Sequence, residues 1–147
     1  MDVEPVAFGD VDWTRLALRH VPHDLDDLAD GWLIHSGEDL RGDPELPYWW
    51  AWEASDHLVH EYPRLALDFI VAVLARPIED EQRFYLAAGP LEDVLALHGV
   101  EIIGEVERLA RQNPLFRDTL RGVWKLSTMS DDIWERVQAA HGYQASP

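Results

Sequence analysis

The feature that most constrains this chain is the way proline and glycine divide its helical pattern. Apolar residues recur at the three- and four-residue intervals of an amphipathic helix, and no stretch shows the sustained alternation of a strand. Pro22, Pro63, Pro77, Pro90 and Pro114 interrupt that pattern, and a helix interior does not tolerate proline. The sequence therefore predicts an all-α protein of eight or nine short helices in a single domain, residues 1–147.

Most of the expected helices begin at a capping side chain or at a proline, and several end at a glycine. They run from Asp12 to the stop at Pro22, from the cap Asp24 to Gly37, from Pro47 to about Tyr62, from Pro63 to Pro77, over about 79–88, from Pro90 to Gly99, over 100–112, over a single turn from Pro114, and onward from the cap Ser130. The helix from Pro63 is apolar nearly all round, which is typical of a buried helix. Such helices pack as an irregular bundle or as stacked antiparallel pairs.

Composition excludes several classes of protein. The 147 residues hold 28 Asp and Glu against 12 Lys and Arg, a net charge of -16, and a chain this acidic repels a nucleic-acid backbone. The absence of cysteine excludes disulfides and zinc–thiolate sites. No apolar run has the length of a membrane span, and the first residues are acidic rather than basic and apolar. We therefore expect a cytoplasmic protein without a membrane or nucleic-acid partner.

The negative charge is concentrated near the start of the chain. Residues 1–62 carry 15 acidic and 3 basic side chains, whereas residues 63–147 carry 13 and 9. One interpretation is a solvated face that keeps the protein soluble. The other is a surface that meets a cationic partner, since opposite fields speed association. On that interpretation the candidate charge contacts are Asp26, Asp27, Asp30, Glu38 and Asp39.

Three tryptophans fall within four positions, at Trp49, Trp50 and Trp52. Successive side chains of a helix are rotated by about 100°, so the three cannot all point into the core. At least one is expected at the surface or under a loop. Buried aromatic anchors dominate protein interfaces, and we take Trp49 or Trp50 as the candidate anchor; packing of these rings against the loop at residues 38–46 is the alternative.

The same helix carries a possible metal site. Glu53, His57, His60 and Glu61 share one side of it, and imidazole and carboxylate groups on adjacent turns can ligate zinc or iron. The spacing matches neither His-Glu-x-x-His nor the Glu-x-x-His of di-iron bundles. The nearest candidates for a second pair are His20 and His23, which have a proline between them. A partly exposed helix face without a metal is the expected outcome.

Other enzyme templates do not fit. The sequence has no Gly-x-Ser-x-Gly, no phosphate loop and no Gly-x-Gly-x-x-Gly. No pair among the 28 acidic residues stands out as a glycosidase pair. We therefore predict no catalytic residues and no cofactor.

Two strings in the second half are distinctive: Leu-Ala-Ala-Gly-Pro-Leu-Glu-Asp-Val-Leu at residues 86–95, followed by His-Gly, and Pro-Leu-Phe-Arg at 114–117, followed by Leu120 and Gly-Val-Trp at 122–124. Over about residues 45–125 the chain resembles an uncharacterised bacterial family of small acidic helical proteins. The resemblance implies an all-helical bacterial cytoplasmic protein of a type that is often encoded near toxin or secretion-associated genes. The structural residues of the motif are Gly89, Pro90, Leu91, Glu92, Arg117 and Trp124.

Within that motif, Gly89-Pro90 combines a helix stop with a helix start and predicts a rigid corner. We expect Glu92 to pair with Arg117 or Arg121 across the corner. A corner of this kind indicates a structural role rather than catalysis.

Small size, concentrated acidity, surplus tryptophan and the missing catalytic templates together favour a binding protein. The leading prediction is an immunity or antitoxin-type protein that neutralises a basic toxin domain by protein–protein contact. The alternatives are a metal-assisted hydrolase that uses the face of Glu53, His57, His60 and Glu61, and a non-catalytic helical scaffold or regulatory subunit.

Overall fold

The computed structural model describes residues 6–143, and in that range the chain forms seven α-helices, one 3-10 turn and one π-helical segment, with no strand. The all-α prediction is confirmed, but the number of helices is lower than the expected eight or nine. The chain divides into two compact units, Met1–Ile78 and Glu79–Pro147. In the described range, no helix combines the length and the apolar character needed to cross a bilayer.

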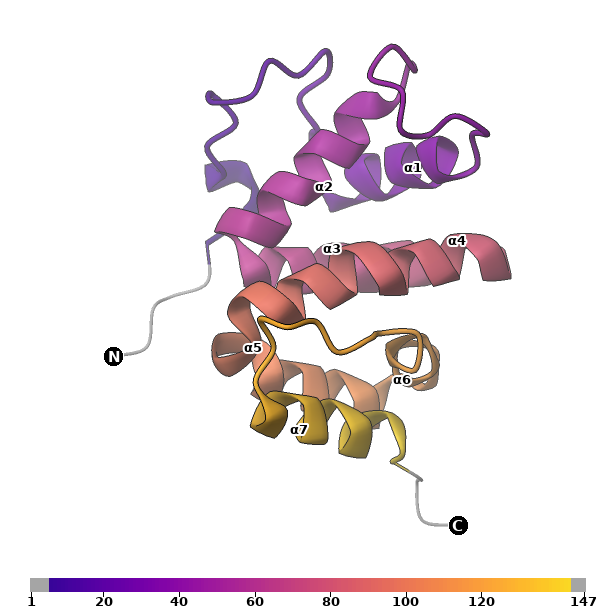
Figure 1. Ribbon diagram of the computed structural model, residues 1–147. Coiled ribbons are helices and arrows are strands. Elements are labelled where there is room, and N and C mark those ends of the chain that lie inside the picture. Colours follow the sequence, from indigo (N-terminus) through magenta and orange to yellow (C-terminus); the bar gives the residue numbers. More distant parts are fainter. Residues whose placement is uncertain (1–5, 144–147) are drawn as a thin grey trace. The chain divides into compact units, whose positions relative to one another are not determined.

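The first unit is built from three helices. After the 3-10 turn η1 (Phe8–Asp10) come α1 (Leu25–Ser36), α2 (Trp49–Glu61) and α3 (Pro63–Leu74), each of which packs against the other two (Figure 1). The predicted start signals are confirmed: the Asp24 carboxylate accepts a hydrogen bond from the amide of Asp27, and Pro63 opens α3. As its apolar sequence predicts, α3 is largely buried.

The close approach of α1 to α2 depends on Gly31. A methyl group added at Gly31 would lie 2.7 Å from the far ring atoms of Trp50 and 3.2 Å from the Cβ of Ala51. The six-membered ring of the Trp50 indole therefore occupies the space that a side chain at position 31 would need. This contact fixes where α1 crosses α2.

The helix predicted from Asp12 to Pro22 does not form. The Asp12 carboxylate accepts hydrogen bonds from the amide (2.9 Å) and hydroxyl (2.5 Å) of Thr14, a local turn that competes with helix formation. The segment is also attached to α2: the amide of Asp12 donates to the Tyr62 hydroxyl, and its carbonyl lies 2.8 Å from Nε2 of His57. A stretch this short has little helical stability of its own, so these contacts determine its conformation.

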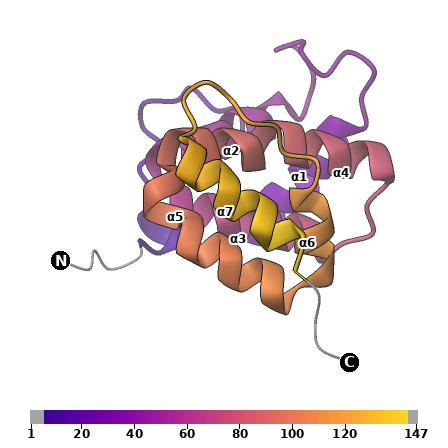
Figure 2. The same ribbon diagram turned by 60° about the horizontal axis from the view of Figure 1, so that its bottom comes forward.

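The second unit begins with helical segments that follow one another without a loop, and a kink at His98 interrupts the last of them. They are α4 (Asp80–Leu86), the π-helical segment η2 (Ala87–Leu91) and α5 (Glu92–Gln112), which are followed by α6 (Pro114–Leu120) and α7 (Asp131–His141). The expected caps are present, since Pro114 opens α6 and the Ser130 hydroxyl accepts a hydrogen bond from the amide of Ile133. Helices α5 and α7 pack along one another, and α6 packs against both (Figure 2).

The prediction of a corner at Gly89-Pro90 is wrong. The π-helical segment Ala87–Leu91 continues the helix through the motif, and the flanking residues Leu86 and Glu92 have helical dihedral angles. A turn of π-helix is wider than a turn of α-helix. It therefore leaves room for the proline ring, which would clash with a backbone carbonyl in a regular α-helix. The chain therefore changes helix type at the motif and does not turn.

Glu92 has a different partner from the one expected. Its carboxylate is buried and accepts a hydrogen bond of 2.7 Å from the backbone amide of Trp124. Arg117 donates instead to the carbonyl of Ala110 and lies over the Tyr143 ring, and Arg121 pairs with Asp118. Glu92 thus attaches the segment after α6 to the start of α5, while the Trp124 side chain is exposed.

The helix end predicted at Gly99 agrees with the structure to within one residue, because a kink at His98 divides α5 into two helical parts. His98 has non-helical dihedral angles (φ -132°, ψ 21°). A methyl group at the next residue, Gly99, would lie 2.9 Å from Ile133 of α7. The glycine thus permits the close approach of α5 and α7 just after the kink.

The Gly31–Trp50 contact predicts opposite effects for two alanine substitutions. Gly31→Ala should destabilise the protein by about 1–3 kcal/mol, because the methyl group overpacks the α1–α2 contact. Gly104→Ala should stabilise it by about 0.5–1 kcal/mol, because Gly104 is exposed in α5 with no atom within 4 Å of the added methyl. Thermal and denaturant unfolding measure both, and equal effects would contradict the proposed packing.

The Glu107–Arg136 pair, which joins α5 to α7, predicts a pH-dependent loss of stability. Hydrogen bonds from Arg136 hold the pKa of Glu107 below its ordinary value of 4.5, although partial burial opposes this. A depressed pKa adds stability above the pKa of the unfolded chain, and that stability is lost as the pH falls through the folded value.

Glu107→Gln should therefore lower the melting temperature at pH 7, and the difference from wild type should shrink as the pH falls below about 4.5. Glu135→Gln is the control, because Glu135 is exposed on α7. A Glu107→Gln difference that is constant from pH 7 to pH 3 would show that the pair does not act through its charge.

Candidate functional site

The three clustered tryptophans of α2 have different environments. Trp50 is 6% exposed and occupies the position opposite Gly31, so it is a core residue and not a surface anchor. Trp49 and Trp52 lie three residues apart and stack, with ring centroids 4.6 Å apart and planes inclined by 19°. Trp52 is 42% exposed, which confirms that at least one of the three reaches the surface.

The segment between α1 and α2, residues 37–48, is an acidic loop that holds Glu38, Asp39, Asp43 and Glu45. Its fold is maintained by His35, which is 2% exposed and whose Nε2 lies 2.6 Å from the carbonyl of Arg41. The His35 ring also packs edge-on against Trp49, with centroids 5.6 Å apart. The same imidazole therefore connects the loop to the stacked tryptophans.

The acidic loop is accessible. Asp39 is exposed, Glu38 is half-buried, and Leu40 at its tip is 71% exposed. Its cations are few: Arg41 donates to the carbonyl of Glu38, and Arg19 lies 3.8 Å from Glu45 in an exposed pair. Within residues 6–143, neither Glu38 nor Asp39 belongs to an ion pair. Together the acidic loop, Trp49 and Trp52 form a surface with apolar rings beside carboxylates, of which Glu38 and Asp39 belong to no ion pair in the described range.

The predicted acidic contacts on α1 have partners inside the first unit. Arg76, which follows α3, donates to Asp30 at 2.5 Å and to Asp26 at 3.0 Å. These hydrogen bonds raise the pKa of Arg76, led by the one to Asp30, although desolvation opposes them. One guanidinium is therefore shared by two carboxylates, so the three groups together carry a net charge of -1. Asp26 and Asp30 thus present less negative charge to a partner than two unpaired carboxylates would.

Asp27 belongs to a separate cluster with two histidines, His20 and His23. One carboxylate oxygen of Asp27 lies 2.7 Å from Nε2 of His20 and accepts a hydrogen bond of 2.9 Å from the backbone amide of His23. Burial raises the pKa of Asp27, but the hydrogen bonds and the adjacent imidazoles outweigh it, so the pKa lies below its ordinary value. In the described part of the chain, these three residues form the one group whose side chains offer three candidate metal-ligand atoms close together.

The face predicted from Glu53, His57, His60 and Glu61 does not form such a group. His57 Nε2 lies 2.8 Å from the carbonyl of Asp12, and Nδ1 of His60 lies 2.9 Å from the carbonyl of Asp56. His57 and Glu61 line a small cavity of about 200 Å³ together with Asp12, whereas Glu53 and His60 lie outside it. The hydrolase prediction therefore has no supporting cluster on this face.

Three features of the surface and the histidine cluster were not predicted. The spacing of Trp52 from Trp49 is that of neighbours on one helix face, but the sequence does not show that Trp52 is the exposed ring of the stack. The sequence places His20 and His23 together. Their contacts with Asp27 join the non-helical segment before α1 to the first turn of α1, and such contacts are not visible in a local pattern. His35 gave no signal, because its role depends on the path of the acidic loop.

The environments of Trp50 and Trp52 predict unequal costs for the same truncation. Trp50→Ala should cost about 3–5 kcal/mol of stability, because it empties the contact between α1 and α2. Trp52→Ala should cost about 1 kcal/mol or less, because the ring is exposed and stacked on one side only. Denaturant unfolding of the two variants tests this, and a larger loss for Trp52→Ala would contradict the assignment of Trp52 to the surface.

Comparison with known proteins places the chain in a family but gives it no activity. A family model described as "Family of unknown function (DUF6869)" matches residues 39–144, from within the acidic loop onward, so that α1, His20 and His23 lie outside the match. No curated protein and no solved structure matches the chain. The expected membership in an uncharacterised family is therefore confirmed: the chain belongs to the family of unknown function DUF6869.

Proposed function

We propose that this chain is an acidic binding protein of the bacterial cytoplasm, of the immunity or antitoxin type, that neutralises a basic toxin domain by protein–protein contact. The observation that carries the proposal is the Trp49–Trp52 stack beside the acidic loop, in which Trp49 is half-buried and Trp52 is exposed. Membership in a family of unknown function is compatible with such a role and does not assign a different role to the chain.

The tryptophan stack supports the apolar part of an interface. Tryptophan is enriched among the residues that dominate binding energy, because its large ring excludes water while it loses little conformational freedom. Trp52 is already held against Trp49, and Trp49 is held against His35. The anchor is therefore ordered before binding, which lowers the entropic cost of association.

The acidic loop supports the choice of a basic partner. Residues 1–78 carry 16 acidic and 5 basic side chains, so the surface lies in the more acidic of the two units. Such a field accelerates association with a cationic protein, and salt screens it. If the partner is a nuclease, the carboxylates of the loop occupy the positions where substrate phosphates would bind, which explains inhibition by contact alone.

Two charge reversals of equal size test the proposal. Glu38→Lys combined with Asp39→Lys changes the acidic loop, and Glu101→Lys combined with Glu135→Lys changes exposed positions of α5 and α7 in the second unit. The net charge of the two variants is identical. Any difference between them therefore depends on where the charge lies.

Each variant, together with wild type and Trp52→Ala, is used as bait in native lysate at low salt, and the basic proteins released by a salt step are quantified. Wild type and the α5/α7 variant should retain the same basic protein in stoichiometric amount. The acidic-loop variant should slow its association by about tenfold at low salt, and Trp52→Ala should speed its dissociation by a similar factor.

The identity of the captured protein decides between the function and a general affinity for cations. A basic toxin whose activity is abolished by one equivalent of wild type agrees with the proposal. Equal capture by the two charge variants, or the absence of any stoichiometric basic partner, contradicts it and favours a scaffold or regulatory subunit.

A further inference from the structure

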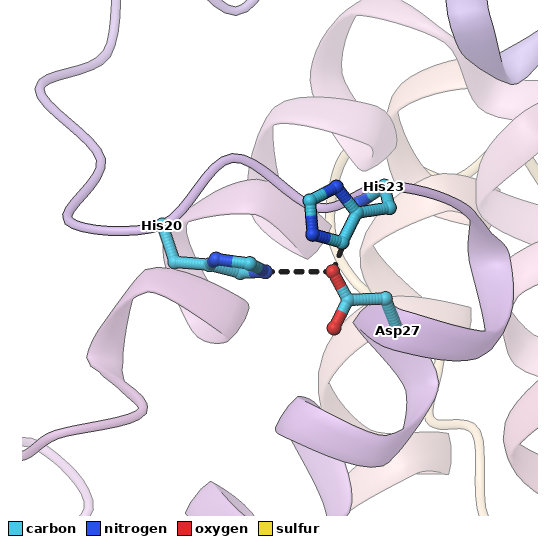
Figure 3. Close-up of side chains that lie close together, drawn as sticks. All are labelled: His20, His23 and Asp27. Atoms are coloured by element: carbon cyan, nitrogen blue, oxygen red, sulfur yellow. Dashed lines mark hydrogen bonds and ion pairs between the residues drawn. The ribbon is translucent and has the colours of Figure 1, made fainter.

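The strongest feature outside the proposed binding surface is the cluster of His20, His23 and Asp27, which lies where the non-helical segment meets the first turn of α1 (Figure 3). We propose that these three side chains bind a divalent transition-metal ion of the zinc class. The proposal does not depend on the partner proposed above, because neither the acidic loop nor the tryptophan stack contributes a ligand.

The geometry of the cluster is close to that of a metal site. One ligand atom from each residue lies within 4.8 Å of the other two, and the side chains of His20 and Asp27 point toward one another (Figure 3). Ligands bound to zinc at about 2.0–2.2 Å are separated from one another by roughly 3–3.5 Å. The His20–Asp27 contact of 2.7 Å must therefore open slightly, and the exposed His23 ring must move inward.

Two of the ligands are already positioned by their surroundings. The ring of His20 rests edge-on against the buried Trp50 (centroids 4.5 Å apart), and Asp27 accepts a hydrogen bond from the His23 amide. Between the histidines, Pro22 is buried and restricts the backbone. A hydrogen bond such as that from the His23 amide orients a ligating carboxylate, and loss of such a bond typically costs about 10–100-fold in metal affinity.

The local charge favours a cation. Asp24 and Asp26 precede Asp27 in sequence and are exposed, although Asp26 also pairs with Arg76. Their carboxylates oppose the partial positive charge that a helix N-terminus places there. His20 binds metal as a neutral imidazole whose proton moves from Nε2 to Nδ1, so the His20–Asp27 hydrogen bond is exchanged for two metal–ligand bonds.

The donor set selects the class of ion. Two imidazole nitrogens and one carboxylate oxygen suit zinc and ferrous iron, whereas magnesium and calcium prefer oxygen ligands alone. Three protein ligands leave the fourth position of a tetrahedral ion to water. A preference for zinc over magnesium would therefore distinguish a specific metal site from non-specific attraction of cations to an acidic protein.

The experiment is a titration of the tag-free protein with zinc ions in an excess of magnesium. Isothermal titration calorimetry measures the affinity and the number of ions bound. Wild type should bind one equivalent. His23→Ala and Asp27→Asn should each weaken the binding at least tenfold. The matched control is His60→Ala, because His60 is also an exposed histidine within reach of one carboxylate, Asp56, at 3.5 Å, and it should bind as wild type does.

His23→Ala is the decisive variant, because the His23 side chain is exposed and its removal leaves the Asp27 hydrogen bond to the backbone in place. Tryptophan fluorescence gives a second readout: zinc should change the emission of wild type through the His20–Trp50 contact and should not change that of His23→Ala. Absence of binding to wild type in magnesium, or equal binding by wild type and His23→Ala, would overturn the proposal.

Discussion

The first unit depends on the contact between Trp50 and Gly31. Because position 31 has no side chain, the indole of Trp50 lies directly against α1 and brings α1 and α2 together. The helical rotation of about 100° per residue then places Trp49 and Trp52 on a different face. The buried tryptophan thus determines that the other two are available as a stacked surface pair.

The Trp50 ring contributes to the position of both the proposed binding surface and the histidine cluster. Its contact with Gly31 sets the position of α2, which places Trp49 against His35, and His35 contacts the acidic loop. Trp50 also supports His20, whose imidazole meets Asp27 on α1. A change at this contact would therefore alter the proposed binding surface and the histidine cluster together.

The acidic residues fall into four groups with different environments. Asp26 and Asp30 share the guanidinium of Arg76, and Asp27 contacts His20 and accepts a hydrogen bond from the His23 amide. Others serve as caps or form exposed pairs. Glu38 and Asp39 lie in the acidic loop without an ion pair in the described range, so no ion pair has to be broken before a partner can contact them. Net charge alone does not reveal this division.

Local signals in the sequence predicted much of the fold. The caps at Asp24 and Ser130 and the prolines that open α3 and α6 lie where the sequence placed them, because capping depends on residues within one turn. The errors lie where distant contacts decide. The segment after Asp12 is held by His57 and Tyr62, and Gly89-Pro90 is absorbed into a π-turn.

The sites were less predictable than the helices for the same reason. The sequence identified the acidic region and the tryptophan cluster, but it could not rank Trp50 against Trp52 without knowing which side of α2 meets Gly31. It also could not connect Asp27 to His20, because that contact requires a non-helical path between residues 12 and 24. Both results follow from tertiary packing rather than from local pattern.

The most direct test of the central claim is hydrogen–deuterium exchange of the chain alone and in complex with the basic protein it captures. The account predicts slowed exchange in residues 37–52, which cover the acidic loop and the Trp49–Trp52 stack, with little change in α5 and α7. Protection confined to the second unit, or no protection of the acidic loop, would contradict the assignment of this surface as the binding site.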